Sequence, residues 1–187
     1  MSGILKVMKR FDTVALLLTL ALASAGLARE GDELLGKPAP PLNLQHWLDS
    51  PPLEMQSLRG KVVLIRWWTD GCSFCSASAP ALRAFDREYR DRGLQVIGIF
   101  HPKPPGDGNL ERVREAARQL GFTFPIALDP DWSALRRWWF DSGTRDWTSV
   151  SFLVDKRGII RYIHPGGTIE KQDSRKIEQM VQQLLAE

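Results

Sequence analysis

The chain has 187 residues and a formal net charge of +3, and its two cysteines are Cys72 and Cys75. Two cysteines exclude a framework of several disulfides, and they are two ligands short of a four-thiolate zinc site. A bridge between positions three residues apart closes almost no loop, so it adds little stability through chain entropy. No run of Lys and Arg with interleaved aromatic residues indicates a nucleic-acid partner.

The N-terminus has the order of charge, apolar core and small residues that is typical of an export signal. Basic residues at 6–10 precede an apolar run at 13–22, and small residues follow as far as Ala28. From its start to Ala28 this stretch is shorter than the roughly 18 residues that span a membrane as a helix. We expect residues 1–28 to be a signal peptide, or else an uncleaved anchor. Residues 29–187, with a net charge of +1, should form one domain outside the cytoplasm.

The first half of this domain reads as strand, helix and strand. An extended, proline-rich segment at residues 36–44 leads to a short strand. Residues 62–65 are a continuous apolar run, the pattern of a strand that is covered on both faces. The cysteines follow it directly, and residues 73–89 are predicted to be a helix with Pro80 as a kink. A second apolar strand is predicted at residues 93–100.

The second half begins with a loop rich in proline and glycine, after which Asn109 is predicted to cap a helix. A short strand is expected at residues 124–128 and a helix at residues 132–140. Residues 149–163 are predicted to form a β-hairpin, two strands around a turn. The final helix places apolar residues along one buried face: Ile177, Met180, Val181, Leu184 and Leu185.

The two cysteines lie between a buried strand and a helix, a place that favours a thiolate. Free N–H groups of the first helical turn and the positive end of the helix dipole should stabilise a thiolate at Cys72. Cys75 lies one turn further along the same side, within reach to resolve a mixed disulfide. We therefore predict that Cys72 is the catalytic nucleophile and Cys75 the resolving thiol of a redox-active disulfide, with no further cofactor.

The string Trp68-x-x-x-Cys72-x-x-Cys75-x-x-x-x-Pro80, preceded by LRGKVVL and followed by GLQVIGI, resembles the TlpA-like branch of thioredoxin-fold proteins. The similarity continues through GFTFPIALD, SFLVDKRGIIRY and HPGG, and so covers residues 36–187. It implies an α/β fold, the thioredoxin-like three-layer α/β/α sandwich with a central mixed sheet.

The same resemblance implies a function. TlpA-like proteins are exported thiol-disulfide oxidoreductases, so the expected location is the periplasm or another exported compartment. The resemblance also implies the direction of electron flow: the protein should reduce disulfides of exported proteins, including apocytochromes, with electrons from a membrane donor.

Two positions depart from the family pattern. Ser149 stands at the position where the family usually has a cis-proline beside the disulfide. Unlike proline, serine has a peptide N–H and no ring, which alters substrate handling and could ease metal access to the thiolates. The position of the buried carboxylate of thioredoxin is Arg66. We expect Arg66 to turn outward at a sheet face and pair with an acid. In the alternative, Arg66 lies near Cys72, stabilises the thiolate and makes the disulfide more oxidising.

Other functions for the same thiols stay open at this point. A Cu(I) delivery protein would use both thiolates, with His101 or His164 completing the site, because soft sulfur suits Cu(I). Ordinary loop histidines are the simpler interpretation of both residues, and we predict no metal ligand. A thiol peroxidase is less favoured, because the chain lacks the threonine-bearing approach to the peroxidatic cysteine of peroxiredoxins. Trp67 and Trp68 alternate across their strand, so one of them should face the disulfide.

Overall fold

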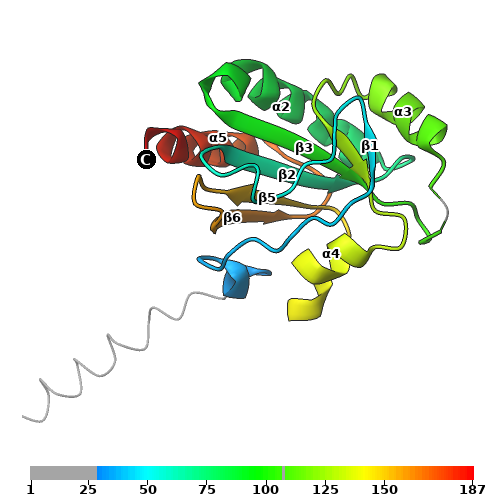
Figure 1. Cartoon of the computed structure of the whole chain (residues 1–187), viewed down its shortest axis with the longest axis horizontal. Coiled ribbons are helices and arrows are strands. Elements are labelled where there is room, and N and C mark those ends of the chain that lie inside the picture. Colours follow the sequence, from blue (N-terminus) through cyan, green and yellow to red (C-terminus); the bar gives the residue numbers. More distant parts are fainter. Residues whose placement is uncertain (1–28, 107) are drawn as a thin grey trace, which may run out of the picture. The chain divides into compact units, whose positions relative to one another are not determined.

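Six strands form one mixed β-sheet in the order β1-β4-β3-β2-β5-β6, as the computed structural model shows (Figure 1). The structure describes residues 29–106 and 108–187, so the expected signal segment lies outside the described residues. Strand β2 runs parallel to β3 and antiparallel to β5. The strands are β1 (His46–Leu48), β2 (Val62–Trp68), β3 (Leu94–Phe100), β4 (Ile126–Leu128), β5 (Val150–Val154) and β6 (Ile160–Pro165).

Helices cover both faces of this sheet, which gives three layers (Figure 1). The α-helices are α2 (Ser73–Tyr89), α3 (Leu110–Gln119), α4 (Ser133–Trp138) and α5 (Lys171–Ala186), and the 3-10 turns are η1 (Asp32–Leu34), η2 (Arg90–Arg92) and η3 (Phe140–Ser142). Buried side chains of α2, α3 and α5 share one core, and those of α4 contribute to a second core. In the described ranges, 29–106 and 108–187, no helix is long and apolar enough to cross a membrane.

Strand β2 lies at the centre of the sheet, and all seven of its side chains are buried. Alternation along the strand sends Val62, Leu64 and Trp68 into the core beneath α2, α3 and α5. The intervening residues Val63 and Ile65 enter the core that α4 covers. The expectation of a strand covered on both faces, and with it the thioredoxin-like α/β/α sandwich, is confirmed.

Most element predictions match the structure, and the differences have local causes. Helix α2 runs from Ser73 to Tyr89 as predicted, and the Asn109 side chain accepts hydrogen bonds from the first turn of α3. Helix α4 begins after Trp132, because that residue has a left-handed φ of 61°. Strand β4 begins after Pro125, which has no N–H to offer a neighbouring strand.

The free edge of β6 is partly covered by a segment near the start of the described chain. The Gly36 N–H donates to the Ile160 carbonyl at 2.8 Å, and the Ile160 N–H donates to the Lys37 carbonyl at 3.0 Å. The Ala39 N–H donates to the Gly158 carbonyl at 2.9 Å. The expected extended segment therefore pairs with the sheet before the chain reaches β1.

Candidate active site

Cys72 is the N-cap of α2, and Cys75 lies in the first turn of that helix. The Cys72 backbone is extended, and its Sγ accepts a hydrogen bond from the Cys75 N–H at 3.2 Å. Cys72 is half-buried, whereas Cys75 is only 2% exposed, and both are free thiols. The helix start thus supplies the N–H donor that sequence reasoning expected, and it leaves one sulfur accessible and one behind it.

The two thiols influence each other's protonation. Burial raises the pKa of Cys75, but hydrogen bonds from Cys72 and Ser149 and the charge of Arg66 outweigh it and leave that pKa below the usual thiol range. Burial and the hydrogen bond to Cys75 raise the pKa of Cys72, although the Cys75 N–H opposes this. The shift at Cys72 does not favour the expected thiolate there, because burial and the hydrogen bond to Cys75 oppose the effect of the helix start. That Cys72 is the nucleophile stays a prediction, supported by its exposure.

Ser149 lies beside the cysteine pair, as the resemblance to the TlpA-like branch implied. Its Oγ is 3.4 Å from the Cys75 Sγ. The Ser149 carbonyl accepts a hydrogen bond from the Gly166 N–H at 2.9 Å, and the preceding Thr148 carbonyl lies 2.9 Å from His101 Nε2. A hydroxyl directed at Cys75 therefore occupies the position where the family has a proline ring.

The expectation that Arg66 turns outward and pairs with an acid is wrong. Arg66 is 1% exposed and lies on the same face of β2 as Trp68, beneath α2. Its guanidinium donates to the Ser151 Oγ at 3.1 Å, the Gly166 carbonyl at 2.9 Å and the Gly167 carbonyl at 2.5 Å. Its positive charge attracts the thiolate forms of Cys75 and Cys72. The alternative that places Arg66 near the pair is the correct one.

The two candidate copper ligands are engaged with backbone. His101 is fully buried, and its Nε2 donates to the Thr148 carbonyl. His164 Nε2 lies 2.7 Å from the Thr168 carbonyl, and its Nδ1 lies 3.9 Å from a carboxylate oxygen of Asp173. Within the described part of the chain, no group of three or more His, Cys, Asp or Glu side chains could hold a metal ion.

One of the two adjacent tryptophans packs on the side of the cysteines, as expected. Trp68 shares the core cluster of Cys72 and Cys75, and its ring makes edge contacts with Phe100 at 5.1 Å and Phe122 at 5.2 Å between centroids. Trp67 points to the opposite face of the sheet. Both rings are buried, so they act here as packing groups.

A shallow apolar pocket of about 210 Å³ adjoins the CxxC segment, and sequence reasoning missed it. Phe74, one of the two residues between the cysteines, is 55% exposed, and Trp147 is 46% exposed. Gly167 is needed there, because a Cβ at that position would lie 2.5 Å from the Phe74 Cβ. The signal for this pocket in the sequence was Phe74, an apolar residue between the two cysteines. The lining residues are Phe74, Trp147, Pro165, Gly166, Gly167 and Thr168.

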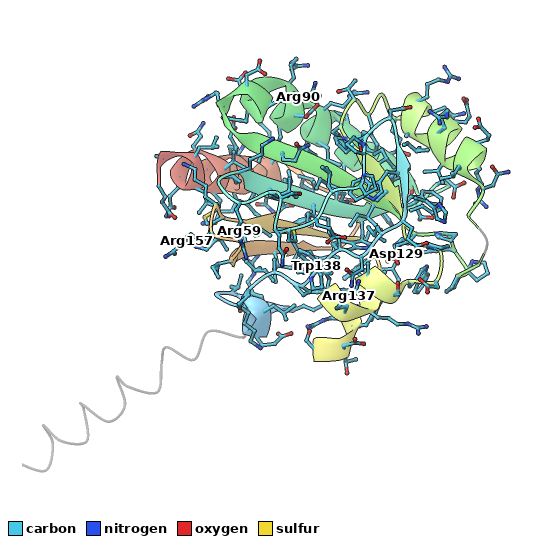
Figure 2. All side chains as sticks on the ribbon, viewed as in Figure 1. Arg59, Arg90, Asp129, Arg137, Trp138 and Arg157 are labelled. Atoms are coloured by element: carbon cyan, nitrogen blue, oxygen red, sulfur yellow. The ribbon has the colours of Figure 1, made fainter. Side chains whose placement is uncertain are left out.

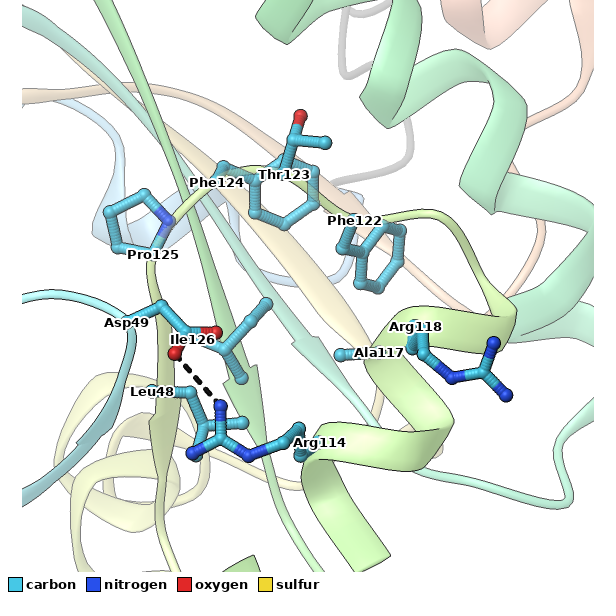
Figure 3. Close-up of a pocket in the computed structure, with 10 residues that line it drawn as sticks. All are labelled: Leu48, Asp49, Arg114, Ala117, Arg118, Phe122, Thr123, Phe124, Pro125 and Ile126. Carbon is cyan, nitrogen blue, oxygen red and sulfur yellow. Dashed lines mark hydrogen bonds and ion pairs between the residues drawn. The ribbon is translucent and has the colours of Figure 1, made fainter. Parts of the chain in front are cut away.

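A second pocket, of about 330 Å³, lies between α3, β4 and the end of β1 and includes neither cysteine (Figure 3). Its two arginines already have partners: Arg114 pairs with Asp49 at 2.8 Å, and Arg118 pairs with Glu115 at 2.7 Å. This pocket offers no reactive group, so we assign the chemistry to the cysteine pair.

Comparisons with known proteins agree with this geometry. The family model for redoxin matches residues 34–181. The chain is 34% identical over 142 residues to protein DipZ of Mycobacterium bovis, an alignment that covers 74% of this chain but only 19% of DipZ. It is 27% identical over 154 residues to the thiol-disulfide oxidoreductase YkuV of Bacillus subtilis, covering 82% of this chain and 97% of YkuV.

Solved structures show the same fold. A thiol-disulfide isomerase from Corynebacterium glutamicum superposes with a TM-score of 0.66 at 24% identity, covering 80% of this chain and 97% of that one. A thiol:disulfide interchange protein from Chlorobium tepidum gives 0.62 at 20% identity, covering 86% and 99%. The redoxin model matches most of the chain, so the chain belongs to the redoxin family.

Proposed function

We propose that this domain works outside the cytoplasm and reduces disulfides in exported proteins, with electrons that it receives from a membrane donor. The observation that carries the exchange chemistry is the asymmetry of the pair: Cys72 is half-buried at a helix start, and Cys75 is buried behind it. The similarity to the TlpA-like branch supports the reducing direction. The charge and apolar pattern of residues 1–28 supports export.

The exchange runs in two steps. Cys72 passes its proton to Cys75 and attacks one sulfur of a substrate disulfide, which forms a mixed disulfide and releases the other substrate sulfur as a thiolate. Cys75 then attacks the Cys72 sulfur, and the second substrate sulfur leaves. The two leaving thiolates take up the proton of Cys75 and one from solvent. Two electrons move from the cysteine pair to the substrate.

The pocket beside the pair supports a polypeptide substrate. Its two exposed aromatic side chains are Phe74 and Trp147, and Phe74 lies between the two cysteines in the chain. Burying such rings against an apolar side chain of the substrate is favourable by about 25 cal/mol per Å² of apolar surface. We propose that an apolar residue flanking the substrate cysteine occupies this pocket during the mixed disulfide.

Phe74→Ser and Trp147→Ser should raise the KM for a disulfide-containing protein by roughly tenfold each, since one lost apolar contact is worth about 1–3 kcal/mol. The rate of oxidation by a small disulfide should stay close to that of the wild type. Leu35→Ser is the matched control, because Leu35 is 41% exposed and does not line this pocket. An unchanged KM in both aromatic variants would contradict the proposed substrate contact.

The direction of electron flow is tested by the equilibrium reduction potential of the Cys72–Cys75 pair in glutathione or dithiothreitol buffers. The many buried tryptophans allow the oxidation state to be followed by fluorescence. A potential near that of thioredoxin, about −270 mV, is the expected result for a reductase. A value near that of DsbA, about −120 mV, would assign the domain to the oxidising direction.

A further inference from the structure

Arg66 is a buried cation, and in residues 29–106 and 108–187 it has no carboxylate partner. Its oxygen acceptors are neutral groups, the Ser151 hydroxyl and the carbonyls of Gly166 and Gly167. No salt bridge of Arg66 occurs in the described part of the chain, and its Nε has no hydrogen-bond partner there. Burying an unpaired charge is unfavourable by several kcal/mol even after relaxation. A fold that keeps such a group therefore benefits from any anion that forms beside it.

The cysteine pair is the group that can supply this anion. Arg66 and Cys75 lie on the same side of the sheet, with Arg66 on β2 and Cys75 in the first turn of α2 above it. Arg66 attracts both sulfurs electrostatically, and its attraction to Cys75 is the stronger of the two. Since both groups are nearly inaccessible to water, the attraction is only weakly screened.

We propose that Arg66 is a positioning residue that holds the reduced cysteine pair as a monoanion and thereby makes its oxidation state depend on pH. The inference rests on the proposed exchange at Cys72 and Cys75, whatever its direction. Oxidation of the monoanion releases two electrons and one proton, and it leaves Arg66 without an anion. The reduced form is stabilised relative to the disulfide, so Arg66 shifts the pair toward a more oxidising potential.

The other titratable groups around the pair do not replace this charge. His101 stays neutral, because burial lowers its pKa to about 3. Asp70 is held by two hydrogen bonds from Arg112, at 2.5 and 2.8 Å. Lys103 is exposed, and its charge favours a lower pKa of Cys72. His164, on β6, interacts with Asp173 of α5. Arg66 is the buried cation among these groups.

The test is the equilibrium of the protein with oxidised and reduced glutathione, measured from about pH 6 to about pH 8. Glutathione thiols are protonated over most of this range, since a free thiol has a pKa near 8.5. Oxidation of a monoanionic pair by glutathione consumes one proton. The equilibrium constant for that oxidation should therefore fall about tenfold for each pH unit above the pKa of the pair. For a pair of neutral thiols the constant should not change with pH.

Arg66→Gln keeps hydrogen-bond donors but removes the charge, so its equilibrium constant should lose the pH dependence. At the upper end of the range this variant should be oxidised at least tenfold more readily than the wild type. Arg66→Lys keeps a cation and should keep the dependence. If Arg66→Gln does not fold, Arg66→Met, which has a similar unbranched chain, takes its place. The absolute value of the constant tests the direction of electron flow, and its change with pH tests Arg66.

Two results would overturn the proposal. One is a wild-type equilibrium constant that does not change with pH over this range, which needs no variant. The other is a folded Arg66→Gln or Arg66→Met protein with the wild-type pH dependence. That result would mean that the start of α2 stabilises the thiolate without help from Arg66. Ultraviolet absorbance of the thiolate, titrated in the reduced wild type and in each variant, measures the anion directly and should change in parallel.

Discussion

Cys72→Ser is expected to abolish thiol-disulfide exchange, whereas Cys75→Ser should accumulate mixed disulfides with its substrates. Cys72 is the accessible sulfur at the start of α2, and without it no bond to the substrate forms. In Cys75→Ser the first bond still forms, but the buried thiol that would break it is missing. The loss in rate should be at least about a thousandfold, in the range seen when catalytic nucleophiles are removed.

The measurement is the turnover of a disulfide-containing protein, followed by non-reducing gel electrophoresis of the reaction. Adducts of Cys75→Ser should disappear when dithiothreitol is added, which shows that they are disulfides. Exchange that survives in Cys72→Ser would reverse the roles of the two cysteines.

Trp138→Ala should lower the free energy of unfolding by about 3–5 kcal/mol, as other large-to-small core substitutions do. The Trp138 ring is 1% exposed and lies between α4 and the sheet (Figure 2). Its centroid is 5.4 Å from that of Trp67 and 5.2 Å from that of Phe152. The indole N–H also donates to the Pro41 carbonyl at 3.2 Å. Urea unfolding of the reduced proteins measures the loss.

Trp147→Ala is the matched control for this prediction, because it removes the same side chain from an exposed position. Its effect on the free energy of unfolding should stay within about 0.5 kcal/mol, as at most surface positions. The cysteine pair lies on the other face of the sheet from Trp138. Equal losses in the two variants would mean that the packing of α4 on the sheet contributes little to stability.

Much of this architecture could be predicted because local signals agree with the fold. The apolar run before the cysteines identified β2, and the bounds of α2 followed from its place after the CxxC start. The resemblance to the TlpA-like branch placed Ser149 beside the cysteine pair, and its Oγ lies 3.4 Å from the Cys75 Sγ. The first two inferences use only neighbours in sequence and the period of a strand or helix.

Arg66 was misplaced although the period of β2 contained the answer. A charged residue in a strand is usually exposed, and that general tendency was preferred over alternation. Arg66 has the same parity as Leu64 and Trp68, so it had to lie on the face that α2 covers. Its partners, the carbonyls of Gly166 and Gly167, are about a hundred residues away in sequence, and no local pattern indicates such neutral acceptors.

The pocket and the acidity of the pair depend on contacts between distant segments. Phe74 and Trp147 are distant in sequence and line one pocket together with residues 165–168 at the end of β6 and just after it. The pKa of Cys75 falls because Cys72, Ser149 just before β5 and Arg66 on β2 all act on this thiol. The helix start, which sequence reasoning used, is only one of several influences on the two sulfurs.

The segment that pairs with β6 has a consequence for self-association. Gly36, Lys37 and Ala39 occupy backbone groups of β6 and of the turn before it that would otherwise face solvent at the sheet edge. An uncovered edge strand is a template for pairing with another chain. Proteolytic removal of the residues up to Ala39 should therefore expose these backbone groups and favour pairing of β6 with another molecule.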